Sequence, residues 1–125
     1  MEDKVLFVDD DNLVLFCFER MLGRHFTLDT APDPWEALQT ISTKGPYSVV
    51  VSDMRMPGLN GIQFLKKAKE LDPGIVGIVL SGNLDETEFE AAGKDIFKVL
   101  SKPCPSDQLI KFIKEAIAHH NDLRK

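Results

Sequence analysis

Apolar and polar positions along the chain form two alternating kinds of segment. Short apolar runs rich in Val, Ile and Leu, typical of buried strands, alternate with segments in which apolar residues recur every three or four positions, as on one face of a helix. The predicted strands cover residues 4–8, 26–30, 48–53, 75–81 and 95–100. The predicted helices cover residues 12–22, 34–43, 61–71, 84–92 and 106–120. Strands that alternate with helices in this way predict an α/β fold with a parallel sheet covered on both faces.

Residues typical of helix ends support these bounds. Asp11 and Asp33 precede two of the predicted helices, where a short acidic side chain can accept hydrogen bonds from the first free N–H groups. Pro34 suits the first helical turn, because its missing N–H would have no partner there. Ser106 is the expected N-cap of the last helix.

The length of 125 residues fits one domain, expected over residues 1–121, with residues 122–125 as a polar tail or the start of a linker. The net charge of -5 argues against a duplex-DNA-binding surface, which needs clustered Lys and Arg. No apolar stretch approaches the roughly 18 residues that a membrane span requires. Neither direct nucleic-acid binding nor membrane insertion is therefore expected.

Cysteine and histidine positions suggest no metal or redox site. The two cysteines are far apart in the sequence, and no signal peptide precedes the first strand, so a reduced, cytoplasmic location is expected. The three histidines, His25, His119 and His120, are expected at the surface and receive no role.

Polar residues that could react or bind a ligand lie where the predicted strands end. Asp9 and Asp10 follow the first strand, Asp53 ends the third, Ser81 ends the fourth, and Lys102 follows the fifth. The carboxyl ends of parallel strands share one edge of the sheet, where open α/β folds place their ligands. The sequence therefore predicts one pocket that holds three carboxylates, a hydroxyl and an amine.

Carboxylates crowded together raise one another's pKa unless a cation is present. Oxygen ligands of this kind suit Mg²⁺, whereas no His or Cys at the strand ends indicates Zn²⁺. A carboxylate can also act as a nucleophile that forms an aspartyl-phosphate. Phosphoryl transfer needs positive charge and hydrogen-bond donors around the transferred oxygens, which Mg²⁺, Lys102 and Ser81 could supply.

Four sequence motifs, in this order and at this spacing, resemble those of the receiver domains of two-component response regulators (the CheY-like superfamily). They are Val8-Asp9-Asp10-Asp11, Ser52-Asp53-Met54-Arg55-Met56-Pro57-Gly58 with Gly61 beyond, Leu80-Ser81-Gly82, and Ser101-Lys102-Pro103. The resemblance covers essentially the whole chain. It implies the flavodoxin-like (βα)₅ fold with strand order 2-1-3-4-5.

The resemblance also implies a role for each residue of the pocket. Asp53 would accept a phosphoryl group from a phosphohistidine of a sensor histidine kinase or phosphotransfer protein. Mg²⁺ would be bound by Asp53, directly by Asp10, through water by Asp9, and by the backbone carbonyl of Arg55. Lys102 would pair with Asp53 before the transfer and with the phosphoryl group after it.

Further expectations from the resemblance concern the switch that follows. Ser81 would bond a phosphoryl oxygen, and the Lys102–Pro103 peptide bond would be cis. The modified domain would then act on a partner or an output domain, with a phosphorylation-dependent dimer as one form. The motifs around Asp53 and Lys102 also resemble receivers fused to HD-type cyclic-dinucleotide phosphodiesterases.

The chain departs from the common receiver pattern three residues before the lysine. Receivers often carry an aromatic switch residue there, whereas this chain has Val99. Phe97 lies two positions earlier, and the period of a strand predicts that it shares a face with Val99 and partly substitutes for the aromatic. The positions two after Asp53 and two after Ser81, Arg55 and Asn83, are expected to modulate the lifetime of the phosphoryl group.

Two enzyme or binding classes are alternatives. A Mg²⁺-dependent aspartyl-phosphate phosphatase of the haloacid dehalogenase type uses an Asp-x-Asp motif after its first strand, which Asp9 and Asp11 match only formally. The chain is also short for such an enzyme. A flavodoxin needs a hydroxyl- and Gly-rich phosphate loop after that strand, and the acidic cluster here would repel a phosphate.

Overall fold

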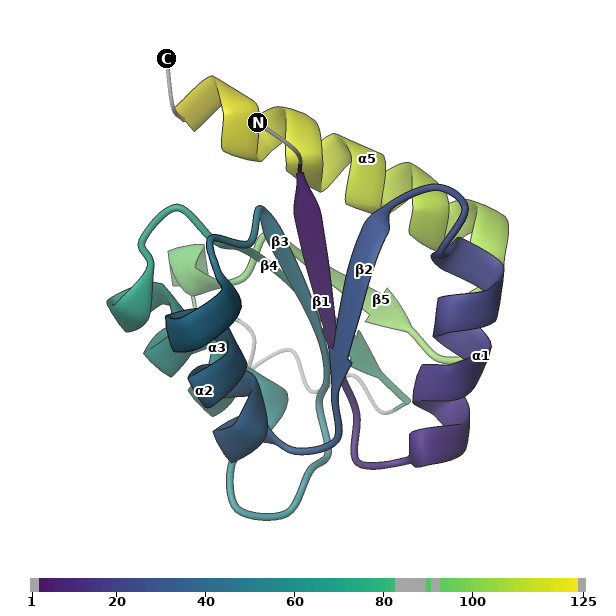
Figure 1. Cartoon of the computed structure of the whole chain (residues 1–125), viewed down its shortest axis with the longest axis horizontal. Helices are drawn as coiled ribbons and strands as arrows, with labels where there is room; N and C mark the ends of the chain where they lie inside the picture. The colour runs from purple at the N-terminus through teal and green to yellow at the C-terminus, as the bar shows by residue number, and fades with distance from the viewer. Residues whose placement is uncertain (1–2, 83–89, 91–92, 124–125) are drawn as a thin grey trace.

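The computed structural model describes residues 3–82, 90 and 93–123 (Figure 1). Its strands are β1 (Lys4–Val8), β2 (Thr27–Ala31), β3 (Val49–Asp53), β4 (Val76–Ser81) and β5 (Lys98–Ser101). Its helices are α1 (Asn12–Leu22), α2 (Pro34–Lys44), α3 (Gly61–Leu71) and α5 (Ser106–Leu123), with a short 3₁₀ turn, η1, at Gly93–Asp95. All strand pairs are parallel, and the order is β2-β1-β3-β4-β5. The predicted flavodoxin-like α/β fold is confirmed.

Helices cover both faces of the sheet, with α1 and α5 on one face and α2 and α3 on the other (Figure 1). Each central strand alternates its side chains between the two layers. In β1, Val5 and Phe7 pack with α1 and α5, whereas Leu6 and Val8 pack with α2 and α3. Because both faces are buried, the strands read in the sequence as continuous apolar runs.

Capping side chains begin three of the helices. The Asp11 carboxylate accepts hydrogen bonds from the N–H groups of Leu13 and Val14, and Asp33 accepts one from Glu36 at 2.8 Å. Both predicted caps are therefore confirmed. Asn60 is the N-cap of α3 and forms a reciprocal capping box with Gln63. This cap was not predicted from the sequence.

The largest departures from the predicted elements lie after β4. Strand β5 begins at Lys98 rather than at residue 95, because Asp95 ends the turn η1 and the paired register with β4 starts only at Lys98. The helix predicted over 84–92 falls, except for position 90, outside the described residues. Helix α5 already includes Ser106, since the Pro105 carbonyl accepts the Leu109 N–H at 3.0 Å, so Ser106 is a first helical residue rather than a cap.

The carboxyl end of α5 also differs from the prediction. The helix continues through Leu123, three residues beyond the predicted end, so part of the expected polar tail is helical. None of the helices in the described part of the chain is long and apolar enough to cross a membrane.

Candidate functional site

Three carboxylates meet at the carboxyl edge of the sheet. One carboxylate oxygen from each of Asp9, Asp10 and Asp53 lies within 4.8 Å of the others. Asp53 is the last residue of β3 and Asp9 follows β1, and these neighbouring strands pair Val8 with Ser52, so both acidic residues leave the sheet at the same level. Asp9 and Asp53 are buried, whereas Asp10 is exposed. The three carboxylates of the predicted pocket therefore lie together at this edge.

Lys102 supplies positive charge to this acidic cluster. Its Nζ lies 2.7 Å from Asp53 Oδ1 and 3.8 Å from Asp9 Oδ2. The Lys102 N–H donates to the carbonyl of Ser81 at 2.9 Å, which extends the β4–β5 pairing to the residue that carries the ammonium group. The Lys102–Pro103 peptide bond is cis.

Asp9 has one oxygen that protein groups do not satisfy. Its Oδ1 accepts the Asp11 N–H at 2.9 Å, but its buried Oδ2 has no hydrogen-bond partner among the described residues. Burial raises the pKa of the Asp9 carboxyl, and the nearby charges of Asp53 and Asp10 raise it further, against the Asp11 N–H and Lys102. A carboxylate with these properties fits a site that is completed by a cation.

The remaining predicted residues surround the cluster at different depths. Ser81 is the last residue of β4, is 2% exposed, and lies one position beyond Leu80, the β4 partner of Asp53. Arg55 is exposed, two residues after Asp53. Asn83, the second predicted modulating residue, lies outside the described residues.

Gly61, quoted above only as part of a motif, lies against the backbone of the site. A Cβ atom at Gly61 would be 2.7 Å from the Asp53 carbonyl oxygen and 3.2 Å from Met54 Cα. The Gly61 N–H also donates to the Met54 carbonyl at 2.9 Å, so the first residue of α3 packs directly on the end of β3. The lack of a side chain at position 61 therefore helps to position Asp53.

Gly61→Ala is expected to destabilise the fold by about 1–3 kcal/mol, because the backbone atoms that the methyl group meets can move only by displacing β3 or α3. Phosphorylation of the chain should also slow, since Asp53 moves with β3. Urea unfolding measures the first effect. Gly82→Ala is the matched control, because a Cβ at Gly82 would have no atom of the described residues within 4 Å. Equal stability of the two variants would contradict the packing role.

Phe97 does not share a face with Val99, and the sequence prediction on this point is wrong. Leu80 and Leu100 are paired and both belong to the core beneath α1 and α5, so Val99, paired with Val79, faces the α2–α3 side. Phe97 packs against the α1–α5 core as well. The alternation fails because Phe97 precedes the first residue of β5 and is not part of the strand.

The family of the chain follows from this fold together with its acidic pocket and from comparison with known proteins. A family model described as "Response regulator receiver domain" matches residues 5–114. The chain belongs to the response regulator receiver domain family. Receiver domains are signalling modules of two-component systems rather than classical enzymes, so the phosphatase and flavodoxin alternatives fall away. A receiver implies a sensor kinase as partner.

Individual relatives support the assignment to this family, and they are described as proteins of different kinds. The chain is 36% identical over 122 residues to the hydrogenase transcriptional regulatory protein HoxA of Cupriavidus necator, covering 94% of this chain and 25% of HoxA. A structure described as adenylate cyclase from Rhodopirellula baltica has a TM-score of 0.93 and 33% identity, covering 99% of this chain and 93% of the other. The signal receiver domain of an HD domain-containing protein from Pseudomonas fluorescens Pf-5 has a TM-score of 0.89 and 25% identity, covering 98% and 99%.

The chain spans about a quarter of the length of the first curated relatives that it matches. The likeness therefore concerns their receiver portion.

Proposed function

We propose that this receiver is a phosphorylation switch in which Asp53 accepts a phosphoryl group from a phosphohistidine of a sensor kinase or phosphotransfer protein. The observation that carries the proposal is the ion pair at 2.7 Å between Lys102 and Asp53 inside a cluster of three carboxylates. An ion pair of this length fixes the orientation of the Asp53 carboxylate, as a nucleophile requires. Neither Asp9 nor Asp10 has so short a contact with Lys102.

The transfer is a displacement at phosphorus. An oxygen of the Asp53 carboxylate forms a bond to phosphorus while the bond from phosphorus to the histidine nitrogen breaks, and the leaving imidazole takes a proton from solvent. Lys102 neutralises negative charge on the transferred group, and the Ser81 hydroxyl, at the end of the neighbouring strand, donates to one of its oxygens. Ser81 at the end of β4 and Lys102 after β5 would thereby both contact the phosphoryl group on Asp53.

Asp9, Asp10, Asp53 and the Arg55 carbonyl would hold Mg²⁺, and the fit rests on the buried Asp9 Oδ2 that lacks a hydrogen-bond partner. When bound, Mg²⁺ supplies positive charge to the phosphoryl oxygens. The pairing of β1 with β3 brings the carboxylates of Asp9 and Asp53 to the same edge of the sheet.

The test is to incubate the protein with Mg²⁺ and acetyl phosphate, a small acyl-phosphate donor, and to weigh it. We expect a mass increase of one phosphoryl group that is lost on treatment with hydroxylamine, which cleaves acyl phosphates. A protein that gains no phosphoryl group under these conditions, while a known receiver in the same buffer does, would refute the proposal.

The surface beside the site suits the docking of another protein. A groove of about 420 Å³ runs between α1 and the segment after β5, and its lining includes Val14, Phe18, Lys102 and Pro103. On α1, the side chains of Leu13 and Phe16 are 69% and 53% exposed. Exposed apolar residues next to a reactive site are typical of a protein-docking surface. We propose that the phosphohistidine-bearing partner docks on α1 and on the groove that Lys102 lines.

Arg55→Asn is expected to shorten the lifetime of the phosphoryl group several-fold. The long cationic side chain of Arg55 is exposed two residues after Asp53, where it can cover the phosphoryl group and hinder the attacking water. Loss of radiolabelled phosphate after donor removal gives the rate. Arg24→Asn makes the same exchange at an exposed position before β2, at the opposite edge of the sheet. An unchanged rate for Arg55→Asn would contradict the prediction.

Which output domain or target protein the switch controls is a separate proposal. The three relatives described above are a transcriptional regulator, an adenylate cyclase and an HD domain-containing protein, so likeness in the receiver does not choose among output classes. The HD-type output predicted from the sequence is one of these. A phosphorylation-dependent dimer is a further prediction, which light scattering with and without acetyl phosphate would test.

A further inference from the structure

Two consecutive histidines hold the end of α5 to the amino-terminal edge of the sheet. The His119 imidazole stacks on the Phe97 ring, with centroids 4.9 Å apart and ring planes at 27°. His120 is 7% exposed, and its Nδ1 donates to the Gly74 carbonyl at 2.6 Å. The surface position expected for His120 is therefore wrong. Gly74 precedes β4 and Phe97 precedes β5, so the last turns of α5 are fastened to the starts of both strands.

The helical spacing of α5 explains this double attachment. Its buried stripe consists of Leu109, Ile113, Ala116 and His120, at intervals of three and four residues. Phe112 and His119 lie seven residues apart beside that stripe, on one face of the helix. Lys98 Nζ lies 4.6 Å from the centre of the Phe112 ring, while Phe97 stacks on His119, so two consecutive residues where β5 begins contact residues about two turns apart on α5.

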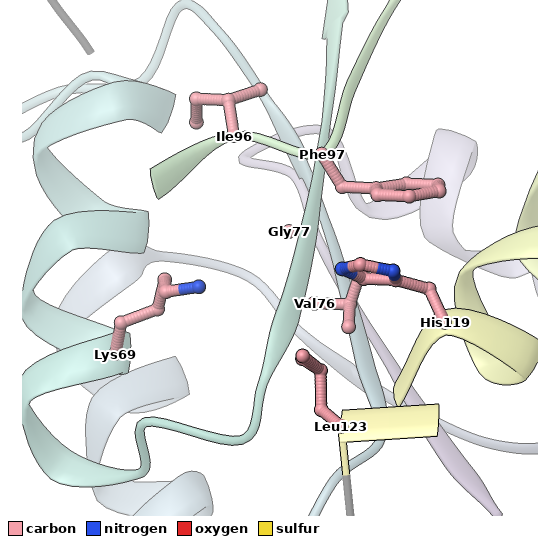
Figure 2. A pocket seen from close by; sticks show the side chains of 7 residues that line it. All are labelled: Lys69, Val76, Gly77, Ile96, Phe97, His119 and Leu123. Atoms are coloured by element: carbon pink, nitrogen blue, oxygen red, sulfur yellow. The ribbon is translucent and has the colours of Figure 1, made fainter. Parts of the chain in front are cut away.

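Phe97 is held to the sheet by its backbone as well as by the stack with His119. The Phe97 N–H donates to the Gly77 carbonyl at 2.8 Å, which attaches the residue to β4 just before β5 begins. Beside the stack is a cavity of about 190 Å³, lined by residues that include Lys69, Gly77, Phe97 and Leu123 (Figure 2). The Phe97 ring therefore has a partner on one side and open space next to it.

The chemistry proposed for the site acts on the other ends of the same two strands. Ser81 ends β4 and Lys102 follows β5, and both would change partners when Asp53 is phosphorylated. Only the four residues of β5 separate Lys102 from Phe97. The strand spans about 13 Å at 3.3 Å per residue and all four of its residues pair with β4, so it links the site directly to Phe97.

We propose that the Phe97–His119 stack relays phosphorylation to the last turns of α5, in place of the aromatic that is absent at Val99. The relay rests on the proposed function, since it needs Lys102 and Ser81 to move toward a phosphoryl group on Asp53. Movement of β5 shifts Phe97 from His119 toward the cavity and loosens the end of α5. His119 acts here as a positioning residue, because it touches no reacting atom.

Hydrogen exchange of backbone amides over residues 118–123, measured with and without Mg²⁺ and acetyl phosphate, tests the relay. We expect exchange there to become about fivefold faster or more on phosphorylation, which is the low end of typical couplings between sites. His119→Ala should abolish this difference, while the phosphoryl adduct forms as in the native chain. His119 is exposed, so the variant retains the core. Lys114→Ala, at another exposed position of α5, is the matched control and should keep the difference.

The outcomes separate the relay from the proposed function. No phosphoryl adduct on the native chain would overturn both. An adduct without a change in exchange at the end of α5, or with the same change in His119→Ala, would overturn the relay and leave the phosphorylation of Asp53 standing. The side-chain resonances of the three histidines give a second measurement. His119 should shift on phosphorylation, whereas His25, which lies between α1 and β2, should not.

Discussion

Asp53→Ala is expected to abolish the phosphoryl adduct that the native chain forms with acetyl phosphate and Mg²⁺. Alanine has no oxygen that could attack phosphorus, and the two other carboxylates of the cluster are poorly suited to replace it. Asp9 has one oxygen committed to the Asp11 N–H and a pKa raised first of all by burial, which lowers its charge. Asp10 is exposed and has no ion pair among those found in the described chain. Intact-protein mass spectrometry measures the loss.

The control for this prediction is an acidic residue remote from the pocket. Asp107 is exposed in the first turn of α5, and Asp107→Asn should be phosphorylated like the native chain. An adduct of equal yield on Asp53→Ala would show that another residue is the acceptor, and peptide mapping would then identify it. Circular dichroism would establish that both variants keep the fold.

The fold could be predicted because its strands are buried on both faces. Neighbouring residues of β1 such as Val5 and Leu6 pack into opposite layers, so the apolar run has no polar interruption and its ends are sharp. The polar residues at those ends then mark one edge of a parallel sheet. Asp9, Asp53 and Lys102 could be grouped for this reason alone, before any distance was known.

The features that the sequence did not predict depend on contacts between distant segments. Gly61 matters because the end of β3 passes 2.7 Å from the place of its missing Cβ, and no local pattern reports that approach. His120 lies on the buried stripe of α5, but only the neighbouring Gly74 carbonyl explains why a polar residue is tolerated there. Phe97 was assigned to the wrong face because β5 is shorter than its apolar pattern suggests.

Lys102→Met is expected to slow phosphorylation of Asp53 by about 100- to 1,000-fold, the usual cost of removing one preorganised group that stabilises developing charge. The Lys102 ammonium lies 2.7 Å from Asp53 and 3.8 Å from Asp9, and methionine keeps the length of the side chain but not the charge. Without it, the buried carboxylates repel one another more strongly, so the pKa of Asp9 rises further. The rate of adduct formation in saturating Mg²⁺ measures the effect.

Lys98→Met separates this electrostatic role from a general loss of charge on β5. Lys98 is the exposed first residue of β5, the strand that Lys102 follows, and its ammonium lies over Phe112 on α5, away from the acidic pocket. Its replacement should leave the rate of phosphorylation unchanged. Lys102→Arg restores the charge but not the compact ammonium group, and we expect only partial recovery, because a planar guanidinium reaches the two carboxylates in a different geometry. A native rate in Lys102→Met would mean that the contact with Asp53 serves the fold and not the transfer.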